Sequence, residues 1–183
     1  MSSIEIPEPN LSRFVFANTQ MAWLWLLIRL YVGYEWLTAA REKLANPAWT
    51  GNKAGTAIQG FLAGALHKTS GANPDVSSWY ASFIKTIILP HAATFSYVVT
   101  YGELAVGIAL ILGLFTGIAA FFGTFMNMNY LLAGTVSINP ILLFLQLFLI
   151  LAWRIAGWFG LDHYVLPTLG VPWQPGKLFT KKR

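Results

Sequence analysis

The sequence predicts an all-α polytopic membrane protein, built as a four-transmembrane-helix up-and-down bundle with amphipathic helices between its first and second spans. Two observations predict this fold class. Hydrophobic residues make up 56% of the 183 residues and charged residues only 10%, well below the roughly 25% charged content of an ordinary soluble domain. The apolar residues also gather in four blocks, each near the roughly 20 residues that a helix needs to cross hydrocarbon: about 20–40, 92–114, 116–134 and 140–159.

A polar leader, residues 1–19, precedes the first block. It contains two glutamates and one basic residue, Arg13, so the block lacks the positively charged flank of a secretory signal. We therefore expect a retained first span. The four-span domain covers about residues 20–166, and residues 167–183 form a basic tail suited to a membrane surface rich in anionic lipid.

The insertion between the first two spans, residues 41–90, is predicted to hold two interfacial helices that cover one end of the bundle. Its first part has apolar residues at helical spacing, namely Ile58, Phe61, Leu62, Ala65 and Leu66. Its second part begins with Asn73 and a proline, which is typical of a helix start. A boundary is expected at Pro90, because the residue before a proline is biased away from helix.

Short connections join the remaining spans. The segment LGLFTG, residues 112–117, has two glycines and suits a tight turn between antiparallel helices. In GTVSINP, residues 134–140, Asn139 before a proline is predicted to cap the fourth span. Neither connection has room for another domain, so the sequence predicts one compact bundle.

The composition excludes several classes of function. The chain has no cysteine, and therefore no disulfide, thiolate nucleophile or iron-sulfur ligand of its own. The net charge is +5, but the basic residues are spread over loops and the tail, so no nucleic-acid surface is predicted. No metal, flavin or nucleotide motif is present.

Charged residues fall inside the first two apolar blocks. A charge near the bilayer centre costs about 2.5–3.5 kcal/mol, so each needs a partner, a water-filled cavity or a function. By the rise of a helix, Arg29 lies about 13 Å into the first span, and Glu103, entering from the other side, about 17 Å into the second. We expect both to lie near the midplane as an ion pair, with Asn127 of the third span at a similar level.

This cluster has two interpretations that the sequence leaves open. It is either an ion pair with asparagine hydrogen bonds that fix which helix faces which, or a site for a polar headgroup or a proton. Glu35 lies nearer the insertion and Arg154 nearer the opposite end of the bundle. Tyr34 and Tyr101 lie beside the charges, where their rings can stack on a quinone.

Three stretches resemble the DoxX/DoxD family of small four-span membrane proteins: GYEWLTAAREKLANPAW (33–49), GELAVGIALILGLFTGIAAFFGTFMNMNYLLAGTVSINP (102–140) and WRIAGWFGLDHYV (153–165). The resemblance covers about residues 20–166 and is closest to the DoxD branch, described as a subunit of thiosulfate:quinone oxidoreductase. It implies a role in passing electrons from a reduced sulfur compound to membrane quinone. The polar positions in the region that it covers are Arg29, Glu35, Lys43, Glu103, Asn127, Asn129, Arg154 and Asp162.

The resemblance implies a membrane subunit of a quinone-linked oxidoreductase that acts on a thiosulfate-like compound and supplies the quinone or anion site. Glu103 and Glu35 are the candidates for proton transfer. The candidates for binding quinone or substrate are Arg29, Asn127, Asn129, Tyr34, Tyr101, Lys43 and Arg154. The alternative is a non-catalytic membrane anchor or assembly subunit of a respiratory complex, so whether the chain is itself an enzyme is left open.

The expected surroundings follow from the same interpretation. Quinone is the expected electron acceptor, and Arg41, Lys43 and Lys53 are placed to attract an anionic substrate. Besides the lipid bilayer, the expected partner is a second protein subunit or another copy of the chain. We expect a multi-pass protein of a prokaryotic plasma membrane.

Overall fold

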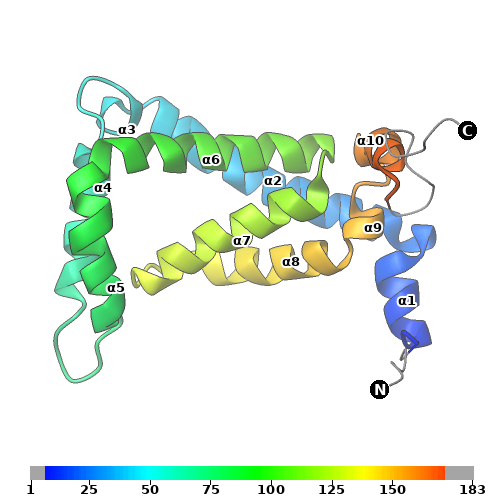
Figure 1. Cartoon of the computed structure of the whole chain (residues 1–183), viewed down its shortest axis with the longest axis horizontal. Helices are drawn as coiled ribbons and strands as arrows, with labels where there is room; N and C mark the ends of the chain where they lie inside the picture. Colours follow the sequence, from blue (N-terminus) through cyan, green and yellow to red (C-terminus); the bar gives the residue numbers. More distant parts are fainter. Residues whose placement is uncertain (1–6, 172–183) are drawn as a thin grey trace, which may run out of the picture.

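The computed structural model describes residues 7–171, and every regular element in this part of the chain is helical. Figure 1 labels the α-helices. Their bounds are α1 Asn10–Ala17, α2 Ala22–Leu44, α3 Pro47–Thr50, α4 Thr56–His67, α5 Ser78–Phe83, α6 Ala92–Leu112, α7 Thr116–Leu132, α8 Asn139–Leu151, α9 Trp153–Ala156 and α10 Asp162–Leu169. Short turns of other helix types are η1 Thr19–Met21, η2 Ile84–Ile88 and η3 Leu89–His91.

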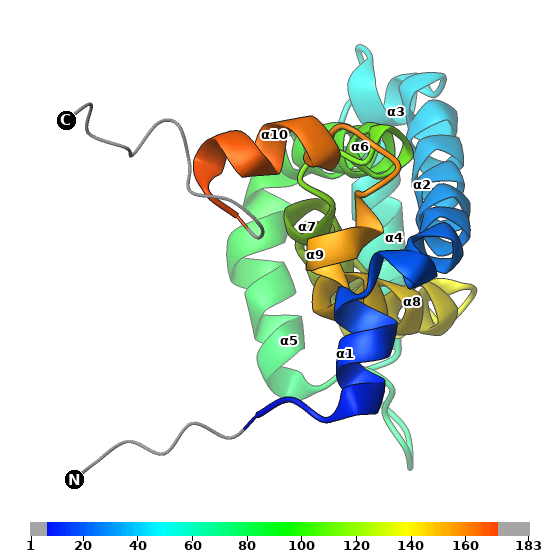
Figure 2. The same cartoon turned by 90° about the vertical axis from the view of Figure 1, so that its right-hand side faces the viewer.

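Four long helices form the body of the molecule. Figure 1 shows α2, α6, α7 and α8 running along its long axis in alternating directions. We call residues 45–91, which contain α3, α4 and α5, the lid, because α4 and α5 lie across one end of the four helices. The helices α1 and α10 lie across the other end, which Figure 2 presents to the viewer. We call this the terminal end.

Glycines allow α2 and α6 to approach closely. A Cβ on Gly33 would stand 3.1 Å from the side chain of Ile111, and one on Gly107 would stand 2.8 Å from the side chain of Leu37. Small residues at such contacts let helix backbones pack tightly, as they do in membrane bundles. This contact fixes the register of α2 against α6, which decides where their charges meet.

Polar side chains lie inside this bundle beside an apolar core, and the outer faces of its long helices also carry large apolar residues. Leu27 of α2, Phe121 of α7 and Phe144 of α8 are 58%, 56% and 58% exposed. A water-soluble domain rarely exposes so many large apolar side chains, because its exposed apolar patches are small and few. The buried polar and charged residues are Arg29, Ser96, Thr100, Glu103, Thr116, Asn127, Asn139, Gln146 and Asp162.

By length and composition, one helix in the described part is long and apolar enough to cross a membrane. It is the continuous helical segment from Ser78 to Leu112, which joins α5 to α6. The helix α8 is apolar but shorter, and it ends at Leu151, whereas the fourth apolar block of the sequence reaches about residue 159. Arg154, expected inside the fourth span, lies on the separate helix α9.

Two predicted helix starts were wrong in detail, and a third boundary is confirmed. The second lid helix begins at Ser78, not near Asn73. The boundary expected at Pro90 is present, because α6 begins at Ala92 and the turns η2 and η3 join it to α5, with the change of direction that Figure 1 shows. Asn139 does not cap α8, since its amide donates to the carbonyl of Thr135 at 3.0 Å.

Candidate functional site

A buried carboxylate, Glu103, lies within hydrogen-bond distance of an ammonium and a phenol. Lys43 Nζ is 2.8 Å from Oε2 and donates to Oε1 at 3.0 Å. The Tyr130 hydroxyl donates to Oε1 at 2.6 Å. The Glu103 side chain is 1% exposed and that of Lys43 is 18% exposed. We call these three residues, from α2, α6 and α7, the Glu103 group.

The lid covers the Glu103 group. The Tyr130 ring packs edge-on against Phe61 of α4, with ring centroids 6.2 Å apart. The Lys43 ammonium lies 5.1 Å from the ring centroid of Trp49 in α3, a favourable cation–π arrangement. Lys43 also lies in the last turn of α2, where a positive charge is stabilised by the helix dipole. The group is therefore enclosed on the lid side by aromatic rings.

The expected ion pair between Arg29 and Glu103 is not formed. Lys43 is the partner of Glu103, and it lies roughly 21 Å beyond Arg29 along the same helix. The cause is the register of the two helices: the first turn of α6 lies beside the lid, where Ser96 donates to the carbonyl of Trp49 at 2.6 Å. The prediction from depth took both apolar blocks to begin at a membrane surface, and it therefore placed Glu103 against the wrong turn of α2.

Arg29 lies at the terminal end, between two loops. Its Nη2 donates to the carbonyl of Phe159 at 3.0 Å, and the residue is 1% exposed. Gly113 and Gly160 make room for the guanidinium, because a Cβ on either one would collide with Nη1. The Asp162 carboxylate acts electrostatically on its charge. Arg29 therefore ties α2 to the loops after α6 and α9.

Asp162 joins the start of α10 to the start of α7. Its Oδ1 accepts from the Phe115 backbone N–H at 2.5 Å, and its Oδ2 accepts from the Thr116 N–H at 2.9 Å. The first N–H groups of a helix have no intrahelical acceptor, and a negative charge there also complements the helix dipole. Phe115 has a left-handed φ of 47°, a conformation uncommon outside glycine, and the carboxylate holds it in place.

Asn127 forms a hydrogen bond with Gln146 and is not part of the Glu103 group. Its Nδ2 donates to Gln146 Oε1 at 2.8 Å, and both residues are fully buried. Gln146 Nε2 and the Trp36 indole nitrogen both approach the position that a Cβ on Gly123 would occupy. The helices α2, α7 and α8 therefore meet around one buried amide pair.

Replacing Gly123 with alanine is expected to destabilise the protein by about 1–3 kcal/mol, because the added methyl collides with the Gln146 amide inside a packed core. The matched control is Gly60→Ala in α4, where an added Cβ meets nothing within 4 Å. That change should leave stability unchanged or raise it by up to about 1 kcal/mol through helix propensity. Denaturant unfolding in detergent measures both, and equal effects of the two changes would contradict this packing.

Asn129 lies one residue before Tyr130 and attaches α7 to the lid. The Tyr80 hydroxyl donates to the Asn129 carbonyl at 3.0 Å and to its Oδ1 at 3.1 Å. Nearby, Lys68 Nζ donates to the carbonyl of Gly134 at 2.5 Å. These contacts hold α4 and α5 against the end of α7, next to the Glu103 group.

The family comparison covers the Glu103 group, Arg29 and the pair of Asn127 and Gln146, but not Asp162. The sequence model of the DoxX family matches residues 24–153, well over half of the chain. The chain belongs to the DoxX family. DoxX proteins are usually integral to membranes, and the matched region contains all three residues of the Glu103 group. Neither the curated proteins nor the solved structures compared with this DoxX chain gave a match.

Four candidate residues of the DoxX chain lie apart from the Glu103 group. Tyr34 and Tyr101 are 62% and 52% exposed and face outward from α2 and α6. Glu35 is half-buried and makes no hydrogen bond or ion pair with residues 7–171. Arg154 pairs with Glu8 at 3.3 Å on the exposed terminal end. Among the residues proposed from the sequence for proton transfer or binding, the structure therefore brings only Lys43 and Glu103 into contact.

Tyr130 and Tyr80 lie in or beside the candidate site of the DoxX chain, and the sequence did not single them out. Tyrosines in a membrane protein are expected at the lipid headgroups, so the sequence offers no reason to place these two tyrosines in a buried site. One signal was present: Tyr130 follows Gly123 by seven residues and Asn127 by three, so all three share one face of α7. That face also carries the buried Asn127.

Proposed function

We propose that this DoxX protein is the membrane subunit of a quinone-linked oxidoreductase that acts on a thiosulfate-like sulfur compound, and that the Glu103 group exchanges the protons of quinone reduction. One observation carries the proposal: a carboxylate that is 1% exposed contacts both an ammonium and a phenol. Carboxylates held in such surroundings are suited to proton transfer, and ionisable residues inside membrane proteins commonly mark proton relays.

The proposal includes four membrane spans, α2, α6, α7 and α8. Its support is the arrangement of side chains, because the outer faces of these helices carry large apolar residues while Arg29 and Glu103 are buried between them. The helix α2 needs this arrangement most, since it contains Arg29 and Glu35. Lipid offers no partner for a charge or a backbone polar group. A charged side chain in a membrane-spanning helix is therefore stable only when it is buried between helices.

In the proposed redox step, two thiosulfate ions that couple through their terminal sulfur atoms release two electrons, and a quinone takes up two electrons and two protons to become a quinol. The chain contains no cysteine, so in this scheme the sulfur and redox chemistry comes from a cofactor or a partner subunit. In this scheme the protons reach the quinone through Glu103. Lys43, which is 18% exposed, lies on the solvent side of Glu103, and the half-buried Tyr130 lies on its other side.

The anion is proposed to approach at the lid end. Arg41 and Lys53 are exposed there and make no side-chain ion pair with residues 7–171. Lys43, which the sequence placed with them, is engaged by Glu103 instead. The attraction to an anionic compound therefore comes from Arg41 and Lys53, and Lys43 serves the carboxylate.

We expect Glu103→Gln to lower thiosulfate-dependent quinone reduction by at least about 100-fold, because general acid–base groups contribute about 10²- to 10⁴-fold. The assay uses the chain purified together with any subunits that accompany it, and follows a soluble quinone analogue spectroscopically. The amide oxygen of Gln can still accept from Lys43 and Tyr130, but its NH2 group donates only and the side chain cannot take up or release a proton.

The matched control is Glu35→Gln, the same chemical change in a carboxylate that lies outside the Glu103 group. It should keep most of the activity. If activity is lost in Glu35→Gln and kept in Glu103→Gln, proton transfer would be assigned to Glu35 instead of Glu103. Full activity in both variants, with all redox centres on a co-purifying partner, would favour the alternative of a non-catalytic anchor or assembly subunit.

A further inference from the structure

A groove at the terminal end has the dimensions and chemistry of a site for a lipid headgroup. It lies between α1 and α10 and has a volume of about 770 Å³, within the usual range of ligand sites. Figure 2 shows the two helices lying across this end. Its lining residues are Asn10, Arg13, Phe14, Ala17, Asn18, Thr19, Trp158, His163 and Pro167. No aspartate or glutamate is among them.

Both walls of the groove are fixed to the bundle. On the α1 side, the Trp25 indole donates to the carbonyl of Val15 at 2.8 Å, and Phe16 stacks on Trp25 with ring centroids 5.6 Å apart. On the α10 side, the Asp162 backbone N–H donates to the carbonyl of Gly113 at 2.8 Å. The groove is therefore formed before any ligand binds, which lowers the entropy cost of binding.

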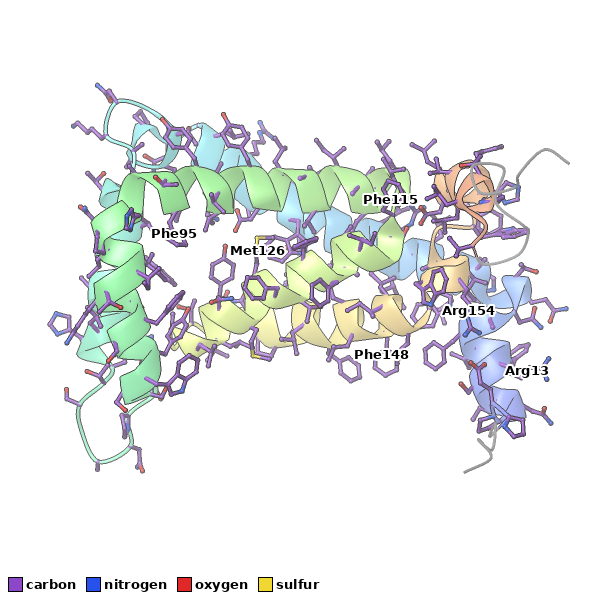
Figure 3. The ribbon with its side chains drawn as sticks, in the orientation of Figure 1. Arg13, Phe95, Phe115, Met126, Phe148 and Arg154 are labelled. Atoms are coloured by element: carbon purple, nitrogen blue, oxygen red, sulfur yellow. The ribbon has the colours of Figure 1, made fainter. Side chains whose placement is uncertain are left out.

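The charge at the groove is positive. Arg13, on α1 in Figure 3, is exposed and its side chain makes no hydrogen bond or ion pair with residues 7–171. The neighbouring Arg154 differs, because Glu8 pairs with it at 3.3 Å. A guanidinium without a carboxylate partner is well suited to a phosphate, whose oxygens its planar array of donors matches.

Apolar residues around the groove select a lipid over a soluble phosphate. Leu11 and Phe14 on the outer face of α1 are 74% and 43% exposed, and Tyr164 of α10 is 72% exposed. A helix with such a face lies in the headgroup region with its apolar side toward the acyl chains. A phosphate in the groove would have its acyl chains beside these residues.

From these observations we infer that the groove between α1 and α10 binds the phosphate of an anionic phospholipid through Arg13. The inference is independent of the proposed electron-transfer function, because the groove is at the end opposite the Glu103 group. Asn10, Asn18 and Thr19 provide further hydrogen-bonding groups along the same wall.

Native mass spectrometry of the full chain tests this site, using phosphatidylglycerol and phosphatidylcholine with the same acyl chains. The unmodified chain is expected to retain phosphatidylglycerol preferentially, and Arg13→Gln should weaken its binding by about fivefold, the effect of one basic residue near an anionic surface. Lys85→Gln removes the same charge from an exposed residue of the lid and should leave the preference unchanged. Melting temperatures in detergent verify that both variants fold.

Three results would overturn the inference. The first is a chain that shows no preference between the two lipids. The second is an equal loss in Arg13→Gln and Lys85→Gln, which would mean that only net charge matters. The third is displacement of the bound lipid by millimolar glycerol 3-phosphate, because a soluble headgroup that competes as well as the lipid leaves no role for the apolar rim.

Discussion

Replacing Asp162 with alanine is expected to destabilise the protein by about 2–5 kcal/mol, because each buried hydrogen-bond donor left without an acceptor costs about 1–3 kcal/mol. The change removes the acceptor of two backbone N–H groups at the start of α7. It also leaves Arg29, which is 1% exposed, without the opposite charge that acts on it. Unfolding by denaturant in detergent, compared with the unmodified chain, measures the loss.

The double variant Arg29→Met/Asp162→Ala separates these two contributions. It should be less destabilised than the sum of the single variants, because removing Arg29 removes the uncompensated charge while the exposed N–H groups of α7 remain unsatisfied. Asp75→Ala, a change in an exposed acidic residue of the lid, is the control and should shift stability by less than about 0.5 kcal/mol. An effect of Asp162→Ala as small as that of the control would contradict the role of this carboxylate.

The sequence was sufficient to predict helices, and it singled out polar residues inside them. Arg29, Glu103 and Asn127 are indeed buried in the bundle. Burial of such residues can be predicted from a sequence, because a charge within an apolar run is stable only where protein or water, not lipid, surrounds it. The pattern along each helix is local, so it can be read without knowledge of the neighbouring helices.

The partners of these residues could not be predicted, because they depend on register. The lid continues beyond α2 and lies beside the first turn of α6, which moves Glu103 level with Lys43 rather than with Arg29. The sequence of an apolar block alone does not indicate such a shift in helix register. The contacts that set the register are those of Gly33 with Ile111 and of Gly107 with Leu37. They can be identified only when both helices are seen together.

Replacing Lys43 with methionine should destabilise the protein by about 3–5 kcal/mol, because Glu103 then stays buried without a counter-charge. Methionine keeps most of the aliphatic chain that packs beside Trp49, so the effect isolates the charge. Arg41→Met is the matched control on the same turn of α2. Its side chain makes no ion pair with residues 7–171 and is exposed, so stability should change by less than about 0.5 kcal/mol.

A second change at Glu103 decides whether charge is the cause. In Lys43→Met/Glu103→Gln the buried group is neutral and still accepts from Tyr130, so most of the lost stability should return. The coupling between the two sites would then be large, as expected for residues in direct contact. If the double variant is instead as unstable as Lys43→Met alone, packing of the lysine chain under the lid, not its charge, stabilises this part of the bundle. That result would also weaken the proton-transfer proposal, which needs an electrostatic link between Lys43 and Glu103.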